Sequence, residues 1–110
     1  MRGEQYLTRS AQYGLVYERG GTRTSELLVM KVLPNGLDLS RYGLSVSRRV
    51  GKAVVRNRTR RRLREILRQV TLKPGWDMIF IVRAKAAGAS FSDLQSTVLR
   101  LLSRGNLLVE

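Results

Sequence analysis

The chain has 110 residues, of which 43% are hydrophobic and 26% charged, and its formal net charge is +13. This length suits one domain with a single modest core, and the composition is that of a globular rather than a disordered chain. Because the chain contains no cysteine and no histidine, disulfides, thiol nucleophiles, zinc-finger sites and the commonest general base are excluded.

Membrane and catalytic functions also find little support in the composition. No apolar stretch reaches the roughly 18 to 20 residues of a membrane-spanning helix, and Met1 to Glu4 open no hydrophobic signal segment. We therefore expect a cytoplasmic protein with no membrane partner. The eight carboxylates are scattered, and no two fall at a spacing that would set them side by side on one helix for a metal-dependent nuclease. No catalytic residue is predicted.

The first predicted element is a short helix over residues 10–19, closed by Gly20 and Gly21 as a helix stop. Tyr13 and Tyr17 fall on one face of this helix, four residues apart. Such a pair can pack a helix onto a sheet, or it can stack on the bases of a single-stranded nucleic acid. The spacing alone slightly favours packing.

Two strands are predicted next. Residues 27–33 form a nearly continuous apolar run, short enough for a strand buried on both faces. Residues 42–47 alternate strictly between large apolar side chains and small ones. The small face would let a nucleic-acid backbone approach closely, and it would equally suit a packed helix. Its residues are Gly43, Ser45 and Ser47.

The densest charge lies in a predicted helix over residues 53–70, in which residues 56–64 include six arginines. From Arg48 to Arg68 there are ten basic residues and one acid, a net charge of +9. An apolar stripe follows the same helix, so one side docks while the rest presents guanidinium groups. Arginines four apart repel each other by about a few tenths of a kcal/mol per pair. A run this dense therefore indicates an anionic partner.

The remaining chain supplies a strand and a helix. Residues 78–82 are predicted as a second strand buried on both faces, after a Lys-Pro-Gly break. The last helix begins at Ser90, with Asp93 three residues on as a capping box. Residues 107–109 form either a frayed tail or a short edge strand. The order helix, strand, strand, helix, strand, helix predicts one α+β domain over residues 1–110, with helices packed on a sheet.

The kind of positive charge narrows the choice of partner. The basic residues are 17 arginines and 4 lysines, and guanidinium forks suit phosphates and base edges better than an ammonium does. A membrane surface fits poorly, because the apolar stripe is narrow and is needed for the core. DNA reading would call for a helix-turn-helix pattern, which is lacking. RNA is the favoured partner.

The segment from Gly43 to Glu65 resembles the signature block of the bacterial ribonuclease P protein subunit. A strand ending Gly-Leu-Ser-Val-Ser is followed by two arginines, a glycine, an alanine and Arg-Asn-Arg at the same spacings. This combination is specific, whereas Arg-Asn-Arg alone would carry no weight. The order of the surrounding elements also matches, so the resemblance covers nearly the whole chain.

The resemblance implies a two-layer α+β sandwich, with a mixed central sheet and an unusual left-handed βαβ crossover through the arginine helix. The usual crossover is right-handed. It also implies a ribosomal-protein-like domain inside a ribonucleoprotein, whose RNA subunit acts with Mg²⁺ to remove the 5′ leader of precursor tRNA. The implied partners are this catalytic RNA and precursor tRNA, with no small-molecule substrate. No protein-only Mg²⁺ site is predicted.

The resemblance assigns residues to each RNA. A central cleft between the first helix and the sheet is expected to hold the single-stranded leader. Relatives often carry other residue types at Met30, Thr59 and Arg62. The leader contacts implied are Tyr13, Tyr17, Met30, Ser45 and Ser47. The contacts implied for the RNA subunit are Arg48, Arg49, Lys52, Arg56, Asn57, Arg58, Arg60, Arg61, Arg64 and Arg68.

Two other functions remain open at this point. A ribosomal or RNA-chaperone protein would use the same basic face without any processing role. An autonomous nuclease would lose cleavage when a carboxylate such as Asp77 or Asp93 is replaced.

Overall fold

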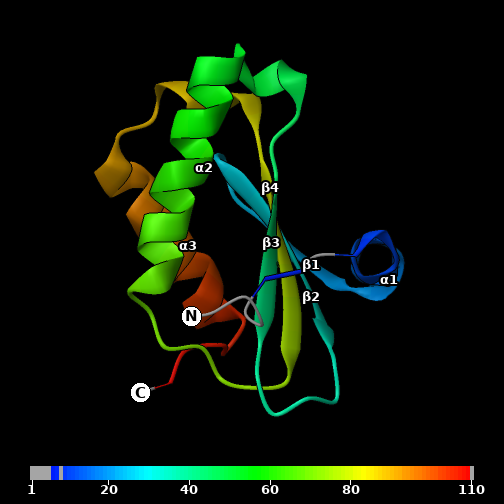
Figure 1. Cartoon of the computed structure of the whole chain (residues 1–110). Coiled ribbons are helices and arrows are strands. Elements are labelled where there is room, and N and C mark those ends of the chain that lie inside the picture. Colours follow the sequence, from blue (N-terminus) through cyan, green and yellow to red (C-terminus); the bar gives the residue numbers. More distant parts are fainter. Residues whose placement is uncertain (1–5, 8, 110) are drawn as a thin grey trace.

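The computed structural model describes residues 6–7 and 9–109 and shows a sheet with helices on both of its faces (Figure 1). The helices α2 and α3 cover one face, and α1 lies against part of the other. Short 3-10 helices are also present: η2 (Arg48–Val50) precedes α2, and η3 (Ala84–Gly88) follows β4. The elements in chain order are α1 (Ser10–Arg19), β1 (Gly21–Thr24), β2 (Leu28–Pro34), β3 (Arg41–Ser45), α2 (Ala53–Arg68), β4 (Trp76–Val82) and α3 (Phe91–Arg104).

The strands form a mixed sheet in the order β1-β2-β4-β3. The pairs β1/β2 and β2/β4 are antiparallel, and β3/β4 is parallel. Since α2 joins the two parallel neighbours, the structure contains the βαβ crossover that the resemblance implied. The α+β class with a mixed sheet is thereby confirmed, and the hand of the crossover stays a prediction.

Alternation along the strands divides the core in two. The even-numbered side chains of β2 and β4, among them Met30 and Phe80, point to one face of the sheet and enter the main core beneath α2 and α3. Odd-numbered side chains, such as Ile79, point to the opposite face and join Val16 of α1 and Leu7 in a smaller cluster. The prediction of burial on both faces is confirmed for the middle of β4, whereas the α1 side of β2 is only half-buried.

The arginine helix forms because its apolar stripe docks on the sheet. The buried residues of α2 are Thr59, Leu63, Ile66 and Leu67, which repeat at the spacing of one helix face. Thr59 satisfies its hydroxyl within the helix by donating to the carbonyl of Val55 at 3.0 Å. A threonine on the buried side therefore leaves no polar atom without a hydrogen bond.

Two segments differ from the sequence prediction. Gly20 caps α1 in an extended conformation, and the chain then enters β1 at Gly21, a strand that we did not predict. A Cβ on Gly20 would press on the carbonyl oxygen of Val16, so glycine permits this close approach. Near the C-terminus, Leu108 makes an antiparallel bridge with Leu72, and residues 107–109 are therefore not a frayed tail. No helix in the described ranges is long and apolar enough to cross a membrane.

Candidate nucleic-acid interface

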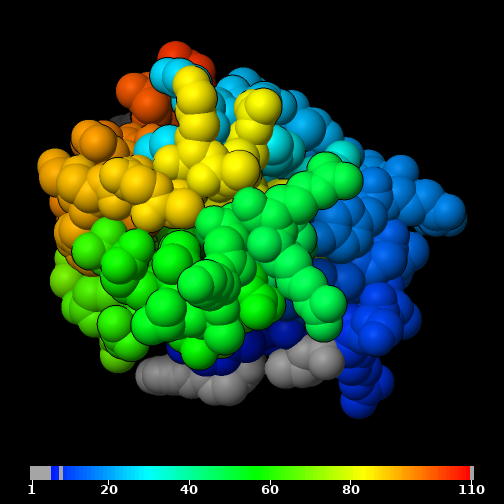
Figure 2. Space-filling model, turned by 90° about the horizontal axis from the view of Figure 1, so that it is seen from above, coloured from blue at the N-terminus to red at the C-terminus, as the bar shows by residue number. Residues whose placement is uncertain are grey.

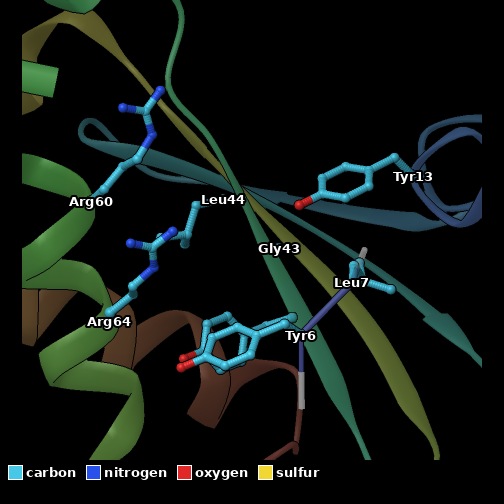
Figure 3. A pocket seen from close by; sticks show the side chains of 8 residues that line it. Tyr6, Leu7, Tyr13, Gly43, Leu44, Arg60 and Arg64 are labelled. Carbon is cyan, nitrogen blue, oxygen red and sulfur yellow. The ribbon is translucent and has the colours of Figure 1, made fainter. Parts of the chain in front are cut away.

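The arginines of α2 lie along both borders of its buried stripe. Arg60 and Arg64 leave the helix on the side of β3 (Figure 3). Arg58 and Arg62 lie on the other side, against η3 and the residue that follows it. α2 thus carries two sets of arginines whose surroundings differ.

The arginines on the border beside η3 bond to backbone carbonyls of the chain itself. Arg58 Nη2 donates to the carbonyl oxygen of Ala87 at 3.3 Å, and Arg62 Nη1 donates to that of Ala89 at 3.2 Å. Both arginines are half-buried. These bonds attach α2 to the segment that leads into α3. Arg58 was assigned to the RNA subunit from the sequence, but in this structure its guanidinium has a protein partner.

Other assigned residues bond locally along the helix. Arg56 Nε donates to the carbonyl oxygen of Gly51 at 3.1 Å, and Arg60 Nη1 donates to Asn57 Oδ1 at 2.9 Å. Arg68 forms an ion pair with Glu65, three residues before it, over a distance of 2.5 Å. Such bonds hold the guanidinium groups in place beside the helix while their other N–H groups can still donate.

The remaining assigned cations are exposed, and three of them lie just before α2 begins. Figure 2 looks down on this end of the molecule, where side chains of η2 and the start of α2 (green) lie between those around η3 (yellow) and those of α1 and β1 (blue). The positive side chains at this end form one continuous surface to which phosphates can bind. The exposed cations at this end are Arg48, Arg49 and Lys52, whereas the exposed Arg61 and Arg64 lie farther along α2.

A cavity of about 380 Å³ lies where the β3 edge passes between α1 and α2. Tyr13 enters it from α1, and Arg60 and Arg64 enter it from α2 (Figure 3). The fold therefore brings together one residue assigned to the leader and two assigned to the RNA subunit. The full lining is Tyr6, Leu7, Tyr13, Tyr42, Gly43, Leu44, Arg60 and Arg64.

The floor of this cavity contains backbone hydrogen-bonding groups. β3 is an edge strand, and on its free side the amide of Leu7 donates to the carbonyl of Tyr42 at 2.9 Å. Because alternate residues of a strand direct their backbone groups to the same side, the amide and carbonyl of Leu44 also face the free edge. An extended ligand here would meet polar backbone as well as side chains.

Tyr13 reaches this edge because Gly43 has no side chain. A Cβ on Gly43 would collide with the Tyr13 hydroxyl. Burial raises the pKa of the Tyr13 phenol, and the neighbouring Tyr17 raises it further, against the lowering effects of a hydrogen bond with the Leu44 backbone and of the Arg64 charge. The phenol is therefore protonated at neutral pH and can donate a hydrogen bond.

The other residues assigned to the leader are not all on one surface. Tyr17 is exposed on α1, Ser45 is half-buried on β3, and Ser47 is exposed just after this strand. Met30 is 0% exposed, and it pairs with Phe80 across the sheet on the face that α2 and α3 cover. The assignment of Met30 to the leader is wrong, because its position in the alternation of β2 directs it into the main core.

A buried ion pair on the α1 side of the sheet was not predicted. The carboxylate of Asp77, 5% exposed, accepts from Arg41 Nε at 2.8 Å and from Arg41 Nη2 at 2.7 Å. Asn35 Nδ2 donates to the same carboxylate at 2.9 Å. The bond to Asp77 raises the pKa of Arg41. Asp77 thus joins β4, β3 and the turn after β2, which gives this acid a structural role.

Sequence and structural comparisons agree with this architecture. The Ribonuclease P family model matches residues 1–106. The ribonuclease P protein component of Dehalococcoides mccartyi (strain CBDB1) is 47% identical over 98% of this chain and 90% of its own length. That of Caldanaerobacter subterraneus subsp. tengcongensis is 39% identical over 94% of this chain and 91% of its own.

Solved structures show the same fold. The ribonuclease P protein from Thermotoga maritima has a TM-score of 0.80 at 31% identity, and the match covers 90% of this chain and 96% of that one. The protein from Staphylococcus aureus has a TM-score of 0.85 at 24% identity, over 96% of this chain and 98% of that one. The chain belongs to the ribonuclease P protein component family.

Proposed function

We propose that this chain binds a catalytic RNA subunit and precursor tRNA together, and that the RNA subunit performs the cleavage that removes the 5′ leader. The observation that carries the proposal is the position of Tyr13 at one cavity with Arg60 and Arg64 of α2, the helix before which the exposed Arg48, Arg49 and Lys52 lie. Such a surface can bind a folded RNA through phosphates and a single strand through stacking. The site of action would be the cytoplasm.

The exposed cations at the start of α2 are the proposed contacts to the RNA subunit. Their guanidinium and ammonium groups bind phosphates without regard to sequence. Arg61, which is exposed in the middle of α2 between the two borders of the helix, is proposed as a further contact. Asn57 and Arg56 share this end of α2 and would support the same contact.

The leader is proposed to cross the α1 side of β3. Tyr13 and Tyr17 lie close enough for their phenols to interact, and both can offer ring faces to bases. Ser45 and Ser47 follow Gly43 along the chain and would add hydroxyl groups to the path. This set omits Met30, which the core encloses.

Mg²⁺ is proposed to act with the RNA subunit. This ion is commonly held by one or two carboxylates together with phosphates and water. Asp77, a buried acid in β4, is already held by Arg41 and Asn35. When bound, Mg²⁺ would supply an activated water and stabilise the charge on the phosphate.

Reconstitution tests the proposal. The purified chain is added to the ribonuclease P RNA of a related bacterium such as Dehalococcoides mccartyi at low Mg²⁺, and 5′ processing of precursor tRNA is followed. We expect cleavage with both components and none with the chain alone. Cleavage by the chain alone, or RNA activity that the chain does not raise, would contradict the proposal. Sequencing of co-purified RNA separates it from a ribosomal role, in which ribosomal RNA would dominate.

A further inference from the structure

The cavity beside β3 has a second aromatic wall, which the chain brings from outside the helices and strands. Tyr6 makes a parallel bridge with Tyr42, and the Leu7 amide bonds to the Tyr42 carbonyl at 2.9 Å. The segment before α1 is thus paired to the free edge of β3. This pairing sets Tyr6 at the mouth of the cavity, on the opposite side from Tyr13 (Figure 3).

The Tyr6 ring packs against Tyr42 and is partly open to solvent. Its centroid lies 5.1 Å from that of Tyr42, at an interplanar angle of 67°, which is the edge-to-face arrangement of a stable aromatic pair. Tyr42 is 5% exposed and Tyr6 is 37% exposed. Tyr42 therefore fixes Tyr6, and Tyr6 keeps ring surface available to a ligand.

The charges around these rings favour an anion. Arg60 and Arg64 line the same cavity. Burial and a hydrogen bond with Tyr6 raise the pKa of the Tyr42 phenol, and the charges of Arg64 and Arg68 oppose that rise. The Tyr42 phenol is thus neutral, and the charges of Arg64 and Arg68 act on it. The cavity therefore offers hydrogen-bond donors and positive charge, and among residues 6–7 and 9–109 no carboxylate lines it.

The combination of an open ring, two guanidinium groups and strand backbone matches the parts of one nucleotide. A base has a ring face for stacking and edges that can donate to the Leu44 carbonyl oxygen, and a phosphate suits the guanidinium forks. A volume of about 380 Å³ is at the small end of ligand cavities and fits a ligand of this size. A double helix would not enter it, since its bases are already stacked.

We propose that this cavity binds one nucleotide of a single-stranded RNA, with the base on Tyr6 and the phosphate on Arg60 and Arg64. The inference rests on the proposed function for the origin of the strand, but it adds a contact on the α2 side of β3 that is separate from Tyr17, Ser45 and Ser47. It also gives Arg60 and Arg64 a ligand other than the RNA subunit.

A short oligonucleotide tests the aromatic half of the site without any ribonuclease P RNA. Binding of fluorescently labelled hexaadenylate to the isolated full chain is measured by anisotropy, at about physiological salt. Tyr6→Ala should weaken binding by about 10-fold, the usual effect of losing one stacked base. Tyr6→Phe, which keeps the ring, should bind within about 2-fold of wild type. Equal affinities for Tyr6→Ala and wild type would overturn the proposal.

A second variant at Tyr6 controls for a loss of folding. If Tyr6→Ala lowers the melting temperature strongly, Tyr6→Leu replaces it, because leucine can still cover Tyr42 but has no ring face. Tyr6→Leu should keep the melting temperature near that of wild type and still lose about 10-fold in affinity. Tight binding by a folded Tyr6→Leu variant would contradict stacking on Tyr6.

The proposed phosphate contact of Arg64 is tested against a matched control, Arg104 on α3. Arg64 and Arg104 are both exposed, and only Arg64 lines the cavity. Arg64→Gln should weaken hexaadenylate binding about 5-fold and reduce the slope of log affinity against log salt by about 0.7, the value for one phosphate contact on a single strand. Arg104→Gln should stay within about 2-fold. Equal losses for the two variants would show general attraction and refute a specific phosphate site.

This test is independent of the proposed function. If the oligonucleotide results hold and reconstitution produces no 5′ processing, the nucleotide site stands and the ribonuclease P role falls. If reconstitution succeeds and Tyr6 has no effect on hexaadenylate, the role stands and the site falls.

Discussion

Gly43 controls how α1 meets the sheet at the scale of single residues. Its missing side chain lets the Tyr13 hydroxyl reach the edge of β3, where the phenol bonds with the Leu44 backbone. The alternating strand pattern left open whether small residues served a nucleic acid or a packed helix. The structure shows that at Gly43 the nearest group is a side chain from the helix, and that this side chain itself lines the cavity.

Gly43→Ala should therefore act through Tyr13. The added methyl group would displace the Tyr13 hydroxyl, so leader affinity should fall by about as much as in Tyr13→Ala, roughly 5-fold to 100-fold. In the Tyr13→Ala background, Gly43→Ala should have little further effect, because no collision remains. The measurement is the affinity of reconstituted enzyme for leadered precursor tRNA in a double-mutant cycle. Additive losses would show that Gly43 acts elsewhere.

The buried phenols predict an alkaline limit of stability. Tyr42 and Tyr13 have pKa values raised above their ordinary value of 10.0, so the folded state holds these protons longer than the unfolded state does. Stability is then fully present below pH 10 and falls as the pH rises above it. Tyr42→Phe should flatten this fall in urea unfolding between about pH 9 and 11. An identical pH profile in wild type and Tyr42→Phe would count against burial of the phenol.

At the scale of elements, α2 combines anchoring and exposed arginines. Arg58 and Arg62 bond to backbone carbonyls of the segment before α3, and Arg61 lies exposed between the two borders. The helical pattern predicted which side of α2 would dock. It could not predict these bonds, because the carbonyls come from residues about 27 to 29 positions away in the chain.

Arg58→Ala and Arg61→Ala should therefore fail in different ways. Loss of the bond to Ala87 should lower the free energy of unfolding by about 1 kcal/mol and leave the salt dependence of RNA assembly nearly unchanged. Arg61→Ala should keep the stability and reduce that salt slope by about 0.9, the effect of one phosphate contact. Urea unfolding and filter binding across a salt series measure the two quantities. A reduced slope for Arg58→Ala with unchanged stability would reverse the assignment.

The strands show where sequence patterns reach their limit. The apolar run at residues 27–33 predicted β2 because it is hydrophobic, whereas β1 has the sequence Gly-Thr-Arg-Thr and is entirely exposed. β1 forms because its backbone pairs with the edge of β2, a tertiary effect that leaves no apolar pattern. Met30 was assigned to the leader through the resemblance, and the apolar run around it does not tell which of its two faces meets the main core.

At the scale of the whole molecule, the edge strand β3 joins the two regions proposed to bind RNA. Tyr13 lies on one side of this strand and Arg60 and Arg64 on the other, around one cavity. The resemblance named these residues, but it assigned them to separate surfaces. Their meeting depends on the strand order β1-β2-β4-β3, which leaves β3 at the edge, and no local pattern in the sequence encodes that order.

The central claim is that the chain supplies a contact to the leader that the RNA subunit lacks. The most direct measurement is the affinity of reconstituted enzyme for precursor tRNA with and without a leader, for wild type, Tyr13→Ala and Arg61→Ala. We predict that wild type prefers the leadered substrate, that Tyr13→Ala loses this preference, and that Arg61→Ala keeps it while assembling less tightly with the RNA subunit. Equal affinity of the wild-type enzyme for both substrates, or equal loss of preference in both variants, would contradict the account.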